Sequence, residues 1–247
     1  MASFITDSFF ILSDPQRFAN GMVEAIESVP ADGVFASDNL FTWGRSLGFL
    51  DDPLFMSAIM QNEPNMVEKG CIWRLHTLCW AARQCSRLPG DFVEAGCYKG
   101  FSAKVICDYL QFSQLDKHYF LYDLFIHDSS MNHHSMPEHG EGLFERVKQR
   151  FADQPRVSVI QGGLPGALSQ GAPDRVAFMH IDMNNAEAEV GVLEALFDKM
   201  VPGGIIVFDD YGWLCYSEQK HAEDAWLQQH HERILELPTG QGLLIKC

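Results

Sequence analysis

Two apolar runs that each end on acidic residues frame the stretch 176–212. The first, VAFMHID, ends on Asp182, and the second, GIIVFDD, ends on Asp209 and Asp210. Apolar residues recur between them at helical spacing, and the PGG segment at 202–204 is expected to stop this helix and turn the chain. A strand–helix–strand unit predicts a right-handed crossover between parallel strands, which places both acidic ends at the carboxyl edge of the sheet. Three carboxylates at one edge repel one another unless a cation or protons intervene, so Asp182, Asp209 and Asp210 predict a divalent metal site.

The stretch DFVEAGCYKGFSAKVICDYL, from Asp91, gives a second pattern. Residues 91–95 are a predicted strand, residues 96–100 a tight glycine turn, and residues 102–112 a helix. The turn is not GxGxxG and no GK[ST] follows it, which weakens a dinucleotide reading and excludes a phosphate loop. Glu94 at the strand end disfavours a pyrophosphate and favours a cationic or amino-acid-bearing ligand.

The next predicted strand, residues 118–123, ends on Asp123. An acid at this place is positioned to accept both ribose hydroxyls of an adenosine, so the pattern predicts a nucleoside cofactor; the alternative is an ordinary strand–helix–strand unit with a surface aspartate. A third strand, residues 157–160, ends beside the expected adenine, where Gln161 offers an amide. The residues expected at the cofactor are Glu94, Ala95, Gly96, Tyr98, Ser102, Asp123, Gln161, Gly162 and Asp182.

The order of elements predicts an α/β chain with a Rossmann-like methyltransferase fold. Five parallel strands and a C-terminal antiparallel hairpin at 233–245 give a mostly parallel seven-stranded sheet, with helices on both faces. We place this domain at residues 64–247, beginning with a helix from Pro64 to about Arg87. Residues 1–63 form a helical and irregular extension, either a lid over a substrate pocket or a segment packed on the domain or on a second subunit. Trp43 and Phe49 are its candidate pocket-lining residues.

Charge and cysteine content narrow the classes of partner. With 18 Lys and Arg against 33 Asp and Glu, the net charge of −15 would repel nucleic acid and anionic membranes. No apolar run reaches transmembrane length, and the N-terminus lacks the basic start of a secretory signal. The seven cysteines show no CxxC pair and are expected to be reduced thiols in a cytoplasmic protein.

A polar loop at residues 126–140 carries His127, Asp128, His133, His134, Glu138 and His139. At the ligand edge of the sheet such a loop can supply substrate contacts or a general base. Its spacing fits no standard zinc pattern, and the alternative for any single histidine is a solvated loop.

These motifs resemble known families. GDFVEAGCYKG resembles the cofactor motif of class I S-adenosylmethionine-dependent methyltransferases. More narrowly, LPGDFVEAG, HIDMN and PGGIIVFDDYG are similar to the macrocin/mycinamicin sugar O-methyltransferases, over the chain from Cys71 onward. Members of that family methylate hydroxyls on antibiotic sugars and depend on magnesium.

The resemblance implies roles for individual residues. Glu94 and Gly96 match the methionine end of the cofactor site, Asp123 matches the ribose acid, and Lys99 matches a basic residue of the glycine turn. Asp182, Asp209 and Asp210 match the magnesium ligands. The family usually reads HIDGDLY, in which the second aspartate is a proposed base, whereas this chain has Asn184 there and Ala186 in place of the tyrosine. An amide takes no proton at neutral pH.

The sequence therefore predicts a Mg²⁺-dependent O-methyltransferase that moves a methyl group from S-adenosylmethionine to a hydroxyl of a small-molecule natural product, a sugar or a vicinal diol or catechol. Asn184, His139 and Tyr211 are the candidate catalytic residues, with His180 a further proton acceptor. The alternatives are non-methylating chemistry on the same scaffold, hydroxylation or cyclisation, and a non-catalytic cofactor-binding accessory protein. We expect a homo-oligomer, most simply a dimer.

Overall fold

The computed structural model describes residues 2–131 and 135–247, which divide into two compact units, residues 1–76 and 77–247. Each unit is described by itself. His133 and His134 of the predicted polar loop lie outside the described residues.

The first unit holds a small mixed sheet in which β2 lies between a parallel β1 and an antiparallel β3. Its elements are β1 (Phe4–Ile5), α1 (Pro15–Glu27), β2 (Phe35–Ser37), β3 (Leu40–Thr42), η1 (Gly48–Asp51), α2 (Pro53–Met60), α3 (Met66–Gly70) and the start of α4 (Ile72–Cys85). The helix predicted from Pro64 to Arg87 is wrong as a single helix, because it is interrupted at Cys71. A buried ion pair joins Arg74 Nε to Asp38 Oδ2 at 2.6 Å.

Of the two aromatic residues singled out in this unit, Phe49 packs in a ring cluster with Trp73 and His76. The Trp43 side chain is about half exposed. Their role at a substrate pocket, and that of residues 1–63 as a lid or subunit contact, stay predictions.

The second unit confirms the predicted α/β sheet. Its seven strands run in the order β6-β5-β4-β7-β8-β10-β9, with β4 to β8 parallel and β10 antiparallel to both β8 and β9. The strands are β4 (Asp91–Ala95), β5 (Tyr119–Asp123), β6 (Val157–Gln161), β7 (Val176–Ile181), β8 (Met200–Phe208), β9 (Leu235–Glu236) and β10 (Gly242–Ile245). The helices are α5 (Phe101–Leu110), η2 (Phe112–Gln114), α6 (Leu143–Arg150), η3 (Gly166–Gln170), α7 (Ala186–Leu196), η4 (Phe197–Lys199), η5 (Leu214–Tyr216) and α8 (Ser217–Gln229).

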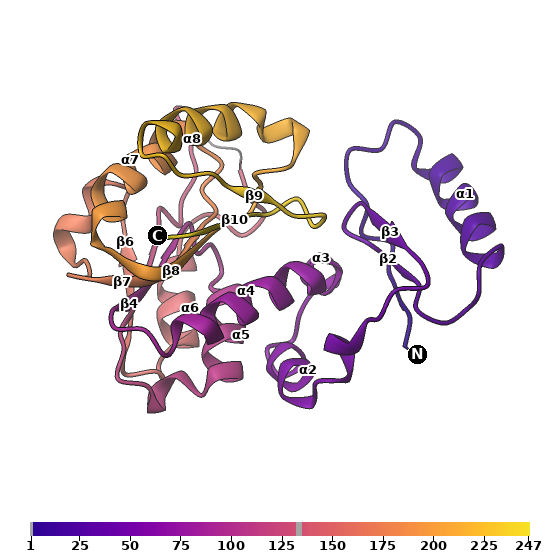
Figure 1. Ribbon diagram of the computed structural model, residues 1–247, viewed down its shortest axis with the longest axis horizontal. Coiled ribbons are helices and arrows are strands. Elements are labelled where there is room, and N and C mark those ends of the chain that lie inside the picture. The colour runs from indigo at the N-terminus through magenta and orange to yellow at the C-terminus, as the bar shows by residue number, and fades with distance from the viewer. Residues whose placement is uncertain (1, 132–134) are drawn as a thin grey trace. The chain divides into compact units, whose positions relative to one another are not determined.

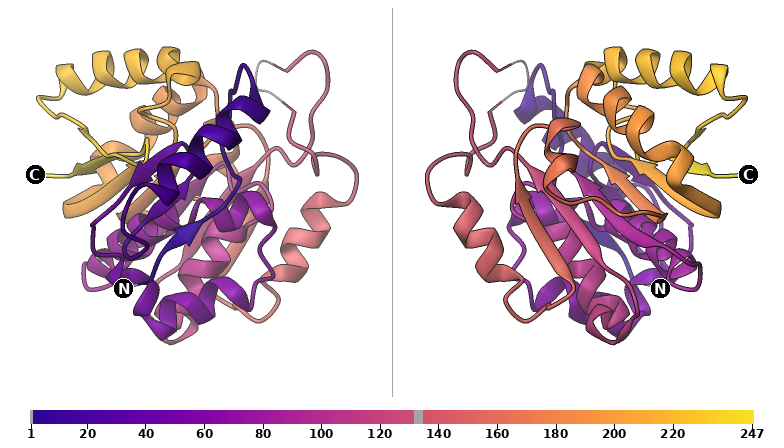
Figure 2. Two further views of the ribbon diagram at one scale, coloured as in Figure 1. Left: turned by 90° about the vertical axis from the view of Figure 1, so that its right-hand side faces the viewer. Right: turned by 90° about the vertical axis from the view of Figure 1, so that its left-hand side faces the viewer.

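Helices cover both faces of this sheet. Figure 1 shows α7 and α8 on one face, and α5 and α6 on the other, with the part of α4 beyond His76. Figure 2 shows the same two layers from the sides. All six residues of β7 are buried, as a central parallel strand requires. No helix among the described residues is long and apolar enough to cross a membrane.

The PGG segment does not end the helix, so that prediction is wrong. The α7 helix already ends at Leu196, and residues 202–204 lie within β8. The strand is irregular there: Val176 pairs with Met200, whereas Phe178 pairs with Ile205. The left-handed backbone of Gly203 (φ 81°) supplies this irregularity, since such a conformation suits glycine.

Candidate active site

A cavity of about 400 Å³ opens beyond the carboxyl ends of the central strands of the second unit. The strand order reverses at β4, which lies between β5 and β7, and ligands bind at such a point in open α/β sheets. The volume lies within the range of small-molecule and cofactor sites. The residues predicted at the cofactor that line this cavity are Gly96, Tyr98, Asp123, Gly162 and Asp182.

Asp123, the last residue of β5, organises one wall of the cavity. Its Oδ2 accepts a hydrogen bond from the Tyr98 amide at 2.7 Å, and its Oδ1 accepts one from the Phe125 amide at 2.6 Å. Tyr98 and Phe125 both have left-handed backbone conformations. The carboxylate therefore holds two strained turns while it remains on the cavity wall.

The segment after β5 contributes His139 to the same wall. Its Nε2 lies 4.0 Å from Asp123 Oδ1, and its ring meets the Tyr98 ring edge to face. The Tyr98 hydroxyl accepts a hydrogen bond from the Glu138 amide, and Lys99 pairs with the Glu138 carboxylate at 3.3 Å. The glycine turn after β4 and the polar loop are thus held together at the cavity.

Glu94 lies inside the unit and is fully buried. Its Oε1 accepts hydrogen bonds from Ser102 Oγ at 2.5 Å and His180 Nδ1 at 2.9 Å, and its Oε2 accepts one from the Tyr119 hydroxyl at 3.2 Å. Within the described part of the chain, the cavity lining includes neither Glu94 nor its partner Ser102, and the same holds for Ala95. Glu94 therefore does not line the cavity, but its hydrogen bonds hold Ser102, His180 and Tyr119 together behind the cavity wall.

Gly96 is a position where only glycine fits. Its φ is 90°, and a Cβ built there would lie 1.8 Å from the carbonyl oxygen of Asp182. The sequence predicts that the missing side chain lets a ligand approach the backbone closely. The structure shows that it also lets the backbone of Asp182, directly after β7, approach closely. The first and fourth parallel strands thereby meet at the cavity.

We expect Gly96→Ala to destabilise the protein by about 3 kcal/mol or more, because the new methyl group clashes with backbone and the left-handed conformation is strained. Urea unfolding measures this loss. The matched control is Gly166→Ala, since Gly166 has no neighbour within 4 Å of a built Cβ. Equal stability of Gly96→Ala and the wild type would contradict the close approach.

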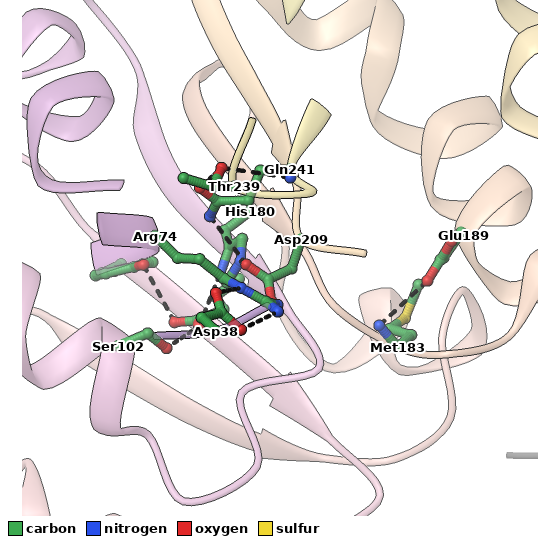
Figure 3. Close-up of polar contacts among 11 residues, drawn as sticks. Asp38, Arg74, Ser102, His180, Met183, Glu189, Asp209, Thr239 and Gln241 are labelled. Atoms are coloured by element: carbon green, nitrogen blue, oxygen red, sulfur yellow. Dashed lines mark hydrogen bonds and ion pairs between the residues drawn. The ribbon is translucent and has the colours of Figure 1, made fainter. Parts of the chain in front are cut away.

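Three side chains at the ends of β7 and β8 form a cluster that can hold a metal ion. His180, Asp182 and Asp209 each offer a ligand atom, and these atoms lie within 4.8 Å of one another. Figure 3 shows His180 and Asp209 facing each other, with Gln241 donating from the β9–β10 turn to Asp209 Oδ1 at 2.9 Å. Asp210, the third predicted ligand, is not in this group of described residues, although its negative charge acts on Asp182.

The carboxylates of this cluster repel one another. Burial raises the pKa of Asp182 well above its ordinary value, and the negative charges of Asp209 and Asp210 raise it further. Burial opposes a charge on His180, but the Asp209 carboxylate, 3.6 Å from Nε2, and the hydrogen-bonded Glu94 carboxylate outweigh this and raise the pKa of the imidazole well above its ordinary value. A cation among these carboxylates would remove the repulsion, so the donor set fits a divalent metal.

The other predicted site residues lie at different places. Asn184 lines the cavity with a left-handed backbone (φ 54°). The Gln161 amide donates to the Leu124 carbonyl at 3.2 Å. The Tyr211 hydroxyl donates to Asp224 Oδ1 at 2.7 Å, and burial, followed by this hydrogen bond, raises the pKa of Tyr211.

Comparison with known proteins bears on this geometry. Residues 93–211 match a family model described as a methyltransferase domain. The matched segment spans 119 of the 247 residues. It includes the strand ends of β4, β5, β6, β7 and β8, and with them Asp123, Asp182 and Asp209. The predicted enzyme class is confirmed at this level. The narrower resemblance to macrocin-type enzymes stays a prediction. No curated protein sequence matches the chain.

Several solved structures are similar to this chain in fold. The O-methyltransferase NovP is 18% identical, with 78% of this chain and 88% of that chain covered and a TM-score of 0.62. The calicheamicin methyltransferase CalS11 is 12% identical over 96% of this chain and 95% of that chain, with a TM-score of 0.61. The S-adenosylhomocysteine-bound methyltransferase PaMTH1 of Podospora anserina is 14% identical over 97% of this chain and 99% of that chain, with a TM-score of 0.52.

Proposed function

We propose that the chain transfers a methyl group from S-adenosylmethionine to a hydroxyl of a small-molecule natural product, with Mg²⁺ bound beside the cofactor. The observation that carries this proposal is a single cavity lined by Asp123 on one wall and by Asp182 of the acidic cluster on another. A nucleoside cofactor and a divalent metal would thus be neighbours. The similarity in fold to the O-methyltransferase NovP and to the calicheamicin methyltransferase CalS11 supports the choice of reaction and acceptor class.

The cofactor would lie along the strand ends. Asp123 would accept hydrogen bonds from the ribose hydroxyls, because a carboxylate at the end of the second parallel strand binds a vicinal diol well. The backbone at Gly96 and Gly162 would allow close approach of the homocysteine and adenine ends. In the described part of the lining no side chain is Lys or Arg, which suits a sulfonium cation better than a phosphate.

Asp182, Asp209 and His180 would hold the cation, with Asp210 close enough to add its charge. A bound Mg²⁺ orients a hydroxyl and lowers its pKa. Asn184, on the cavity wall, can orient the acceptor but cannot deprotonate it. Holding the acceptor oxygen in line with the sulfonium methyl contributes about 7–11 kcal/mol in favourable cases.

The experiment is incubation with S-adenosylmethionine, Mg²⁺ and a panel of sugars, vicinal diols and catechols, followed by mass spectrometry of the products. We expect one acceptor to gain a single methylene, and EDTA to abolish the gain. A converted acceptor without the added methylene would overturn methyl transfer in favour of the hydroxylation or cyclisation alternative. Full activity in EDTA would overturn the metal requirement. The homo-oligomer and the cytoplasmic location are further parts of this proposal, and ultracentrifugation tests the first.

A further inference from the structure

Two glutamates are buried between α7 and α8, outside the cavity and the metal cluster. Glu189 on α7 is 2% exposed and Glu223 on α8 is 1% exposed. Glutamates are almost never fully buried unless they are paired. The burial of these two glutamates therefore needs a physical explanation.

Glu189 accepts hydrogen bonds from the turn that joins β7 to α7. Its Oε1 accepts a hydrogen bond from the Met183 amide at 3.2 Å and one from Gln219 Nε2 on α8 at 2.8 Å. Figure 3 marks the first of these contacts with a dashed line. The Asn184 amide and the Glu223 carboxyl group are further neighbours of Glu189 and act on its pKa. One carboxylate thus accepts hydrogen bonds from a backbone N–H group of the turn and from a side chain of α8, and it has the Asn184 amide and Glu223 beside it.

A carboxyl group can bond to a carboxylate only when one proton lies between them. Burial raises the pKa of Glu223 to about 10, and the negative charge of Glu189 adds to the effect. Burial also raises the pKa of Glu189, but its hydrogen bonds with Glu223, Gln219 and the Met183 and Asn184 amides act in the opposite direction. Glu223 is therefore the proton donor at neutral pH, and Glu189 is the accepting carboxylate.

The turn that Glu189 holds is part of the cavity wall. Met183 and Asn184 both line the cavity, and Asn184 has a left-handed backbone. The Asn184 Oδ1 atom is buried and accepts no hydrogen bond from the described residues. On the opposite side, the Asp182 amide donates to the Ala95 carbonyl at 2.8 Å. The turn is thus fixed by β4 on one side and by Glu189 on the other.

We propose that Glu189, with Glu223 as its proton donor, is a positioning residue that fixes the Met183–Asn184 turn, so that Asn184 presents its amide to the ligand in the cavity. Glu189 touches no reacting atom and acts through the turn. The inference rests on the proposed function only in taking this ligand to be the S-adenosyl cofactor or its acceptor.

The test measures hydrogen exchange at the Met183 and Asn184 amides by NMR in the full chain. Glu189→Leu removes the acceptor, and we expect both amides to exchange about tenfold faster. Glu189→Gln keeps an oxygen acceptor and can donate to Glu223, so its rates should stay within about twofold of wild type. Glu194→Leu, on the exposed side of the same helix, is the matched control.

A second arm measures S-adenosylhomocysteine binding to the same proteins by calorimetry. We expect about tenfold weaker binding for Glu189→Leu, with the wild-type affinity restored in Glu189→Gln. If wild type itself binds no S-adenosylhomocysteine, the proposed function fails while the exchange data still decide the positioning role. If Glu189→Leu does not fold, Glu223→Leu should accelerate the same two amides and Glu223→Gln should not.

Two results would overturn the proposal. One is unchanged exchange at Met183 and Asn184 in Glu189→Leu. The other is equal acceleration along all of α7, which would mean that the glutamate pair stabilises the helix packing and has no particular hold on the turn.

Discussion

Asp182→Asn should bind no divalent cation and lose methyl transfer by about 10³-fold or more, yet it should be more stable than wild type in cation-free buffer at pH 8. Asp182 is crowded by Asp209 and Asp210, and burial and these charges raise its pKa. The amide keeps the shape of the side chain and removes the repelled charge. The variant therefore separates the function of the carboxylate from its cost to stability.

The sign of the pH dependence follows from the raised pKa. Folded Asp182 keeps its proton to a higher pH than the unfolded chain does, so the folded state binds more protons. Below pH 4, which is the region of the pKa in the unfolded chain, Asp182 makes its full contribution to the stability of the folded state. This contribution is lost as the pH rises toward the pKa in the folded state. The free energy of unfolding of Asp182→Asn should exceed that of wild type by an amount that grows over this pH interval. The difference should exceed about 1 kcal/mol, which corresponds to less than one pKa unit.

Urea unfolding at pH 4 and pH 8, with and without Mg²⁺, measures these effects. Mg²⁺ should raise the stability of wild type at pH 8 and leave Asp182→Asn unchanged. Asp198→Asn, an exposed acid in η4, is the control and should behave as wild type. Wild-type Mg²⁺ stabilisation in Asp182→Asn would contradict the assignment of this residue to the cation.

Asp123→Ala should weaken S-adenosylhomocysteine binding by about 100-fold. Two charge-assisted hydrogen bonds to the ribose hydroxyls, at about 1.5–3 kcal/mol each, are more than enough for this loss. The carboxylate also holds the Tyr98 and Phe125 amides, so part of the effect comes from loosened turns.

An analogue that lacks both ribose hydroxyls separates the two contributions. It should bind wild type weakly. Asp123→Ala should weaken binding of this analogue only by the part of the effect that comes from the loosened turns, because the ribose hydroxyls are already absent. Calorimetry supplies the affinities. Asp116→Ala, a fully exposed acid just before β5, is the control and should leave binding unchanged. If Asp123→Ala discriminates between the two ligands as strongly as wild type, the ribose is not at Asp123.

The sheet could be predicted from the sequence because its strands carry a simple signal. A central parallel strand is covered on both faces, so it reads as an unbroken apolar run such as VAFMHI. The acids that follow these runs mark the carboxyl edge, so the sequence alone predicts Asp123, Asp182 and Asp209 at this edge of the sheet.

The parts that were missed depend on tertiary contacts. Gly203 and Gly204 predict a turn locally, but pairing with neighbouring strands draws them into β8. His180 was predicted only as a further proton acceptor, because its place beside Asp209 follows from the pairing of β7 with β8. The contact of Gln241 with Asp209 depends on where the C-terminal hairpin turns, which spacing does not fix.

Glu189 did leave a signal in the sequence. It lies four and seven residues before Leu193 and Leu196, so it shares the buried face of α7 with them. An acid in phase with the apolar face of a helix requires a buried partner, and Glu223 is that partner.

The most direct test of the account is a crystal structure of the chain with S-adenosylhomocysteine and Mg²⁺. We predict the ribose hydroxyls on the Asp123 carboxylate, the homocysteine sulfur facing the Asp182–Asn184 turn, and the metal on Asp182 and Asp209. S-adenosylhomocysteine bound away from Asp123, or a cation bound away from Asp182 and Asp209, would contradict it.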